Sequence, residues 1–184
     1  GPGLNLLALA ARWPGSRFTG IDLSAEAVAL ANSLADAAGL RNITFLSKDL
    51  RDLSDADGEF DYIIAHGVFS WVPDDAKSAL LDRCRRLLAP DGVATISFNV
   101  ECGWRPRISV IEKARAIRQA GGVALMDALA VLRTITENDS PELAIIDDMR
   151  AKGEAVLSFD DFAAMNDPWP LDRFVAAAGD AGLR

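Results

Sequence analysis

The feature of the sequence that most constrains the fold is a glycine-rich turn followed at a set distance by an acidic residue. The chain opens with Gly1-Pro2-Gly3, and Asp22 ends a short β-like run, Phe18–Asp22, 19 positions after Gly3. In parallel α/β sheets the glycines of such a turn let the backbone approach a ligand closely, and the acid accepts hydrogen bonds from two ribose hydroxyls. The sequence therefore predicts a nucleotide-type cofactor at the ends of parallel strands.

The residues after the glycines distinguish one cofactor class from another. A dinucleotide fingerprint has a third glycine, which lets the first helix pack closely beneath a pyrophosphate. This chain continues Gly3-Leu4-Asn5-Leu6, so the third glycine is missing and an NAD-dependent oxidoreductase is disfavoured. A cofactor with one ribose, one adenine and an amino-acid tail needs only the close backbone approach and the acid. S-adenosylmethionine (S-adenosyl-L-methionine) fits that description.

A second acid at a strand end strengthens this interpretation. Residues 43–49 read as another strand, which ends in Asp49 and would lie beside the first in a parallel sheet. A carboxylate there can accept a hydrogen bond from the exocyclic amine of adenine. The alternative is that Asp49 only caps the turn into Leu50, Arg51 and Asp52. The position of Asp22 favours the cofactor role.

The composition narrows the possible functions. Half of the 184 residues are hydrophobic, so a genuine core is expected, and a net charge of −8 without a Lys/Arg-rich block disfavours a nucleic-acid partner. No apolar run is long enough to cross a bilayer, so no membrane partner is predicted. The single histidine, His66, excludes a two-histidine metal site, and a metal-free site is expected. Cys84 and Cys102 do not suggest a disulfide framework, which favours a reducing cytoplasm.

The order of apolar patterns predicts an α/β fold: a doubly wound, Rossmann-like, mostly parallel sheet with helices on both faces. Residues 107–152 show only helical periodicity, which indicates a helical insertion after the fifth strand. We expect a core at 1–104, an insertion or lid at 105–165, and a last core helix within 166–184. Helices that merely enlarge the core are the alternative to a lid. The predicted elements are helices 4–12, 25–38, 74–88 and 170–181 and strands 18–22, 43–49, 60–65 and 93–98.

Both ends of the sequence look incomplete for such a fold. A glycine turn of this kind must be fed by a strand, and that strand should be central in the sheet. A sheet without it would leave two neighbouring strands with unpaired backbone groups. We therefore expect a strand before Gly1 and another after Leu183 and Arg184, within a longer protein.

Several of these segments together resemble a known family. Gly1-Pro2-Gly3, residues 20–24, Asp49 and residues 60–64 are similar to class I S-adenosylmethionine-dependent methyltransferases. Residues 65–73 and 87–94 resemble bacterial methyltransferases that carry a methyltransferase regulatory domain, a group that includes protein-lysine methyltransferases. The similarity extends from Gly1 to about Trp104 and is visible again at residues 166–168.

The resemblance implies a seven-stranded sheet with a hairpin after the last helix, and it implies a set of cofactor-binding residues. These are Gly1, Gly3 and Asn5 at the methionine end, Asp22 and Leu23 at the ribose, Asp49 and Leu50 at the adenine, and His66 beside the sulfonium. Relatives usually read Ser-Tyr-Asn-Thr-Tyr-Pro-Gly-Trp after the fifth strand. Residues 97–104 here lack the second tyrosine and the proline, in a loop that would face the methyl acceptor.

Methyl transfer from a sulfonium is an in-line displacement that depends mainly on positioning, an effect of up to about 7–11 kcal/mol. An N or O nucleophile of a protein side chain or small molecule also has to lose a proton. His66 at the end of a strand, or Glu101, is the candidate base, although His66 could instead only pack on the cofactor. Asn99 could orient the acceptor, and Trp71 and Trp104 could wall it in or simply be buried. A cofactor-binding regulatory module without activity is the alternative function.

Overall fold

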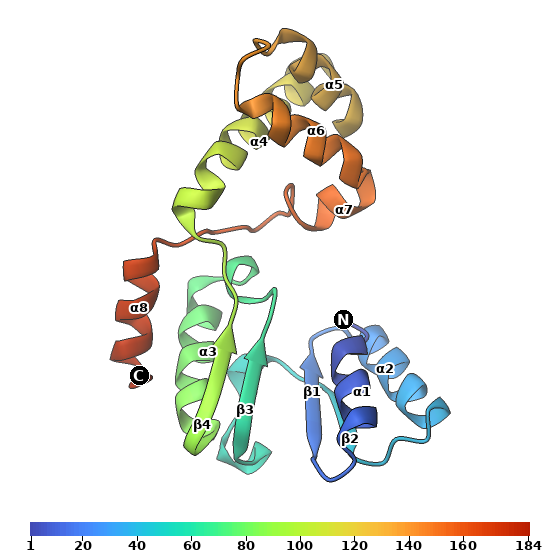
Figure 1. The fold of residues 1–184 in the computed structure, drawn as a ribbon, viewed down its shortest axis with the longest axis vertical. Coiled ribbons are helices and arrows are strands. Elements are labelled where there is room, and N and C mark those ends of the chain that lie inside the picture. Colours follow the sequence, from blue (N-terminus) through green and yellow to red (C-terminus); the bar gives the residue numbers. More distant parts are fainter.

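The computed structural model describes all 184 residues, and they form an α/β half and a helical lobe joined by a narrow neck (Figure 1). We call residues 101–159, which form α4 to α7, the helical lobe; the α/β half comprises the remaining elements. The elements follow in the order α1 (Leu4–Arg12), β1 (Phe18–Asp22), α2 (Ala25–Ala37), β2 (Ile43–Ser47), η1 (Leu50–Asp52), η2 (Asp55–Asp57), β3 (Phe60–Ala65), η3 (Phe69–Trp71), α3 (Asp74–Leu87), β4 (Leu88–Ile96), α4 (Glu101–Gly121), α5 (Leu125–Ile135), α6 (Glu142–Lys152), α7 (Glu154–Phe159) and α8 (Leu171–Asp180).

Helix ends in the α/β half follow local sequence signals. The Ser24 hydroxyl accepts a hydrogen bond from the Ala27 amide at 3.1 Å and caps α2. Gly39 follows this helix with φ of 68°, and Gly182 follows α8 with φ of 84°, a left-handed backbone that glycine adopts without strain. The predicted helices α1, α2 and α8 are thereby confirmed to within a residue or two.

The strands are parallel, as predicted, but they form two separate pairs. β1 pairs with β2 so that Asp22 lies opposite Ser47, and β3 pairs with β4 so that Ala65 lies opposite Ile96. No hydrogen bonds join the two pairs, so each sheet has two strands and the expected continuous sheet is not formed within these residues. The strand expected before Gly1 lies outside the chain described and stays a prediction.

Two strand boundaries differ from the sequence prediction. β2 ends at Ser47, so Asp49 lies two residues beyond the strand, at the start of the short helix η1. β4 begins at Leu88 rather than 93, and its residues 89–92 bulge out of the pairing, since Phe60 pairs with Leu88 and Tyr62 with Val93. Gly92 fits there since a Cβ would lie 2.9 Å from the Phe60 carbonyl oxygen.

The helical lobe also differs in detail from the prediction. α4 begins at Glu101, several residues before the predicted start, and it contains Pro106 near its first turns. A proline lacks the amide proton that a helix interior uses, so the pattern alone places the start after it. The short helix α7 was not predicted, because six residues are too few to establish a period.

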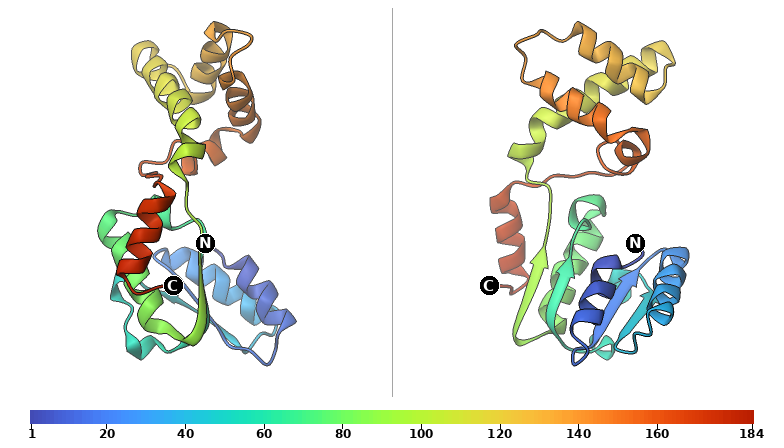
Figure 2. Two further views of the ribbon diagram at one scale, coloured as in Figure 1. Left: turned by 60° about the vertical axis from the view of Figure 1, so that its left-hand side comes forward. Right: turned by 45° about the vertical axis from the view of Figure 1, so that its right-hand side comes forward.

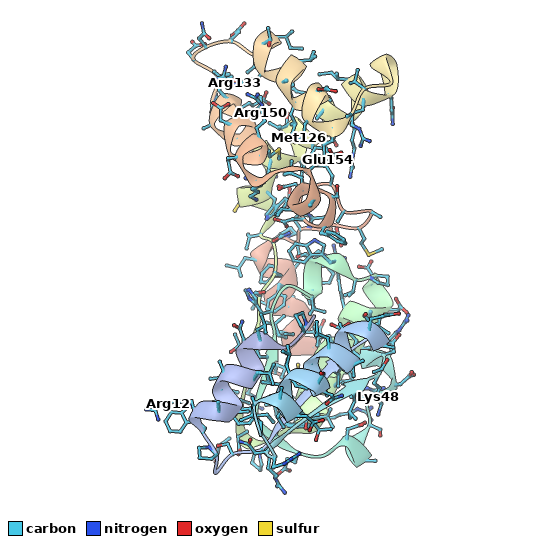
Figure 3. The ribbon with its side chains drawn as sticks, turned by 90° about the vertical axis from the view of Figure 1, so that its right-hand side faces the viewer. Arg12, Lys48, Met126, Arg133, Arg150 and Glu154 are labelled. Atoms are coloured by element: carbon cyan, nitrogen blue, oxygen red, sulfur yellow. The ribbon has the colours of Figure 1, made fainter.

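Buried apolar side chains gather in three clusters, one in the lobe and two in the α/β half. The lobe cluster has nine buried residues from four helices, and Trp104 and Met126 pack against it. A cluster of six joins β3, η3, α3 and Trp169, and a cluster of three joins α2 to β2. In Figure 3 the labelled Met126 and Arg133 lie in the lobe, far from Lys48 in the α/β half.

Two chain segments form the neck, one leaving the α/β half after β4 and one returning before α8. They meet at the neck in both views of Figure 2. The Trp169 amide donates to the Asn99 carbonyl at 3.0 Å, and the Glu101 amide donates to the Trp169 carbonyl at 3.0 Å. The returning segment thereby adds a short parallel bridge beside Val100. None of the helices, in the neck region or elsewhere, has the length and apolar character needed to span a membrane.

Candidate functional site

Asp22 lies at the carboxyl end of β1, beside the glycine turn. One carboxylate oxygen accepts a hydrogen bond from the Ser24 amide at 2.8 Å, and the other contacts the backbone nitrogen of Gly1. Partial burial raises the pKa of this carboxyl, and hydrogen bonds from the Gly1 nitrogen and the Ser24 amide lower the pKa below its ordinary value. Asp22 is therefore a carboxylate at neutral pH, in contact with the turn that begins the chain.

The glycine turn is shaped by an aromatic ring as well as by its backbone. Gly3 has φ of 66° and directly precedes α1. A Cβ at Gly3, or at Gly20 on β1, would collide with the ring of Phe45 on the neighbouring strand β2. The two glycines thus allow Phe45, which is 6% exposed, to pack between the turn and the strand. The sequence pattern assigned Gly3 to the ligand alone and did not identify this packing.

Asp49 lies two residues after β2, the strand that pairs with β1. Its carboxylate accepts from the Arg51 amide at 2.8 Å and caps η1, and it also forms an ion pair with the Arg51 guanidinium at 2.6 Å. The hydrogen bonds from Arg51 lower the pKa of Asp49. The structure therefore contains the alternative that the sequence offered, in which Asp49 caps a turn. Contact of Asp49 and the adjacent Leu50 with the adenine stays a prediction.

His66 follows the last residue of β3 and is exposed at the carboxyl end of that strand. Beside it, Gly67 has φ of 68°, and its amide donates to the Ser97 hydroxyl at 2.9 Å. The Ser97 amide in turn donates to the Ala65 carbonyl at 3.0 Å. These bonds fix the backbone on both sides of His66 and leave its imidazole without a side-chain hydrogen bond.

The residues predicted to contact the methyl acceptor lie around the neck. Two of them already form hydrogen bonds or ion pairs within the protein. The Asn99 amide donates to the Ser70 hydroxyl at 2.7 Å, and its side chain donates to that of Asn166 at 2.9 Å. Glu101 pairs with Arg105 at 2.6 Å within α4. These contacts hold Asn99 in the neck and Glu101 on the lobe.

The two tryptophans belong to different parts of the molecule. Trp71 ends η3 in the α/β half and is half-buried, whereas Trp104 packs against the lobe core under the guanidinium of Arg107 at 5.9 Å. Leu23 and Asn5 are exposed near the Asp22 turn. Both side chains are half-buried, Trp104 packs against the lobe cluster, and a role of either in walling in the acceptor stays a prediction.

A buried lysine near the neck was missed by the sequence interpretation. Lys77 on α3 is 1% exposed, contacts the carboxylate of Asp167, and lies 3.2 Å from that of Asp74. Its ammonium lies 5.1 Å from the centre of the Trp169 ring, and the Trp169 indole donates to Asp167 at 2.8 Å. The signal was available: Lys77 has the helical spacing of the buried residues Leu80, Leu81 and Cys84.

Comparison with known proteins agrees with this geometry. The family described as a methyltransferase domain matches residues 1–92 of the chain. The chain belongs to the methyltransferase domain family. Within it, the fold and the relatives are those of the class I S-adenosylmethionine-dependent methyltransferases, which confirms the resemblance inferred from the sequence.

Individual relatives extend the similarity beyond that domain. Uncharacterized protein RP789 of Rickettsia prowazekii is 36% identical over 135 residues, which is 73% of this chain and 24% of that protein. Trans-aconitate 2-methyltransferase of an Azoarcus species is 36% identical over 98 residues, 53% of this chain and 36% of that enzyme. The structure of PKMT2 from Rickettsia typhi in complex with AdoHcy superimposes with a TM-score of 0.86 at 25% identity, covering 98% of this chain and 37% of that one. The chain thus spans well under half the length of these three proteins.

Proposed function

We propose that this methyltransferase domain binds S-adenosylmethionine across the carboxyl ends of β1 and β2 and transfers the methyl group to an N or O nucleophile. The observation that carries the proposal is Asp22 at the end of β1, beside the glycine turn in which the left-handed Gly3 precedes α1. The complex of PKMT2 with AdoHcy, the demethylated cofactor, supports the choice of cofactor because that fold covers nearly all of this chain.

The residues present fit an adenosyl group. An ionised carboxylate has about four acceptor positions, and Asp22 uses one oxygen for the Ser24 amide and the other for Gly1, so acceptor capacity remains for ribose hydroxyls. The register of β1 on β2 puts Asp49 beyond the neighbouring strand end, on the same edge of the sheet as Asp22. An acid for the sugar and an acid for the base would then lie on adjacent strands.

The cofactor supplies an activated methyl group, and the remaining task of the protein is to position the acceptor and take up its proton. His66 is the better candidate base, because it is exposed at the end of β3 and its imidazole has no other hydrogen bond. Glu101 is the weaker one, because its carboxylate is engaged by Arg105. An imidazole that has no other hydrogen bond and lies near the reacting atoms can take up the proton that the methyl acceptor loses.

We propose a lysine side chain of a protein as the acceptor. Similarity to PKMT2 includes the helical lobe, whereas similarity to trans-aconitate 2-methyltransferase covers only 53% of the chain. A net charge of −8 also favours a cationic acceptor over an anionic one such as trans-aconitate. The helical lobe, which stands over the strand ends, would form one side of the acceptor site as a lid (Figure 1).

Calorimetric titration with S-adenosylmethionine, S-adenosylhomocysteine and NAD tests the cofactor assignment. Binding of NAD without binding of either S-adenosyl ligand would reject it. Transfer of a labelled methyl group to lysine-containing protein tests the activity, and cofactor binding without any transfer to protein or small molecules would indicate a regulatory module.

Replacing His66 with Gln should lower turnover at least about tenfold with unchanged cofactor affinity, as expected for loss of a general base. Equal turnover would assign His66 to packing.

A further inference from the structure

We propose that Arg51 is a positioning residue that fixes the carboxylate of Asp49 so that it accepts one hydrogen bond from the exocyclic amine of the adenine. This inference rests on the proposed function, because it assumes that the adenosyl group lies across β1 and β2. It concerns a residue to which neither the sequence pattern nor the family similarity assigns a role.

The first observation is the number of donors that Arg51 directs at one carboxylate. The Arg51 backbone amide donates to Oδ1 at 2.8 Å, Nε lies 3.1 Å from both oxygens, and Nη2 donates to Oδ2 at 2.6 Å. Backbone and side chain of the same residue therefore hold the Asp49 carboxylate from two directions. A carboxylate held in this way cannot rotate freely about its last bond.

The second observation is what remains of the acceptor capacity of Asp49. An ionised carboxylate offers about four acceptor positions. The Arg51 amide, Nε and Nη2 supply three donors, one of them shared between the oxygens, which leaves about one position. The Asp49 side chain is 18% exposed, so part of it remains accessible to a ligand. One remaining acceptor on a fixed carboxylate matches a single N–H of an adenine amine.

The third observation is that Arg51 is itself held by helix α3. Its Nη1 donates to the Asp75 carboxylate at 2.8 Å, and its carbonyl accepts from Arg83 at 3.1 Å. Asp49 and Asp75 both raise the pKa of the guanidinium above its already high value, so it is charged at any physiological pH. Arg51 thus links the turn after β2 to α3. Its contacts with α3 hold the guanidinium in place while it binds the Asp49 carboxylate.

A purely structural role for Arg51 predicts a different outcome. An exposed ion pair contributes little to stability and does not distinguish one bound base from another. If Arg51 only held the turn together, its loss would weaken every ligand of the site to the same degree. If it aligns Asp49, its loss weakens only ligands that carry the amine.

The experiment compares two ligands on the wild-type chain and on Arg51→Met, which keeps the apolar stem but removes the guanidinium. The ligands are S-adenosylhomocysteine and S-inosylhomocysteine, in which a carbonyl replaces the amine. The wild-type chain should prefer the adenosyl ligand by about tenfold or more, the value of one hydrogen bond to a charged group. Arg51→Met should lose most of that preference while its affinity for S-inosylhomocysteine changes less than about twofold.

Arg41→Met is the matched control, because Arg41 pairs with Asp36 at 3.3 Å as an exposed pair at the end of α2. It should leave both affinities and the preference unchanged. Asp75→Ala, which frees the guanidinium from α3 without touching Asp49, should reduce the preference in the same direction but less, and it provides the test if Arg51→Met does not fold.

Equal weakening of both ligands by Arg51→Met, or an unchanged preference, would overturn the proposal. So would a wild-type chain that binds both ligands equally, since Asp49 would then not contact the amine. A wild-type chain that binds neither ligand would instead refute the proposed function, and with it the proposed role of Arg51 in positioning Asp49. The two failures are distinguished by whether the wild-type chain binds S-adenosylhomocysteine at all.

Discussion

The helical lobe and the α/β half bury their apolar residues in very different ways. The lobe, although it is the smaller part, has one cluster of nine buried residues. The α/β half divides its buried residues between clusters of six and three, one on each pair of strands. It also exposes Tyr62 (74%) and Ile64 (60%) on one face of β3 and Val93 (53%) beside them on β4. The part with the smaller cores is the part that carries the candidate cofactor residues.

This comparison indicates which contacts stabilise the lobe and which stabilise the α/β half. The lobe cluster lies within one set of helices, whereas the two strand pairs share no buried cluster within these residues. A ligand that contacts Asp22 and Asp49 on one pair and lies against the carboxyl end of β3 on the other would join them. A ligand at one hundred times its dissociation constant stabilises the folded state by about 2.7 kcal/mol, so cofactor binding should stabilise the α/β half most.

The largest expected effect comes from the lobe core. Leu129 on α5 is fully buried, and Leu129→Ala should lower the free energy of unfolding by about 2–5 kcal/mol because it leaves a cavity. Affinity for S-adenosylhomocysteine should be unchanged, because the cavity lies in the lobe. Denaturant unfolding and calorimetric titration measure the two quantities.

Val131→Ala on the same helix is the control, since Val131 is 45% exposed and its loss should change stability by less than about 0.5 kcal/mol. Loss of cofactor affinity in Leu129→Ala would contradict the separation of the two parts.

The neck should give the next largest effect. Asp167→Ala removes a carboxylate that contacts the buried ammonium of Lys77 and leaves only Asp74 as its ionic partner. A buried charge that loses its partner destabilises a protein by about 3–5 kcal/mol, and the remaining Asp74 should reduce this to about 2–3 kcal/mol. Thermal unfolding measures the change.

Asp74→Ala is the matched variant, because Asp74 is 72% exposed and lies farther from the ammonium. It should cost less than about 1 kcal/mol. Equal effects of the two variants would mean that Asp167 does not hold Lys77 in the neck.

A smaller effect is expected where the two glycines accommodate Phe45. Gly20→Ala puts a methyl group against the Phe45 ring and should destabilise the β1–β2 pair by about 1–3 kcal/mol through overpacking. Because the same strand carries Asp22, cofactor affinity should fall as well. The double variant Gly20→Ala, Phe45→Leu should recover part of both losses, and a loss that is simply additive would argue against this contact.

The smallest effect concerns pH. Burial raises the pKa of Asp167, but Lys77 and the Trp169 indole outweigh it, so the folded-state pKa lies below the ordinary value of 3.8. A lowered pKa contributes stability that is fully present above 3.8 and is lost as the pH falls through the folded-state value. The stability difference between wild type and Asp167→Asn should therefore be constant near neutral pH and shrink in acid. A difference that grows in acid would contradict the ion pair.

Sequence reasoning succeeded where the cause is local. The cap at Ser24 and the left-handed Gly39 and Gly182 mark helix ends through contacts within a few residues, and alternation of strands and helices was enough for the fold class. The family followed from short motifs near strand ends. These features depend on neighbours along the chain, which a sequence displays directly.

The features that escaped prediction depend on distant contacts. Lys77 and Asp167 are 90 positions apart, and Gly3 accommodates a ring on a strand more than 40 residues later. The start of α4 was misplaced because Pro106 ends a local pattern that tertiary packing allows to continue. The candidate site was predicted as individual residues, whereas the Arg51 contacts that hold Asp49 emerged only from the fold.

Titration of S-adenosylhomocysteine into the wild-type chain, Asp22→Ala and Asp36→Ala tests the central claim most directly. Asp36 is an exposed acid on α2, and its replacement should leave the affinity unchanged. Asp22→Ala should bind at least about tenfold more weakly, because it loses charge-assisted hydrogen bonds to the ribose. Wild-type affinity in Asp22→Ala would contradict the assignment of the β1 end as the site of the adenosyl group.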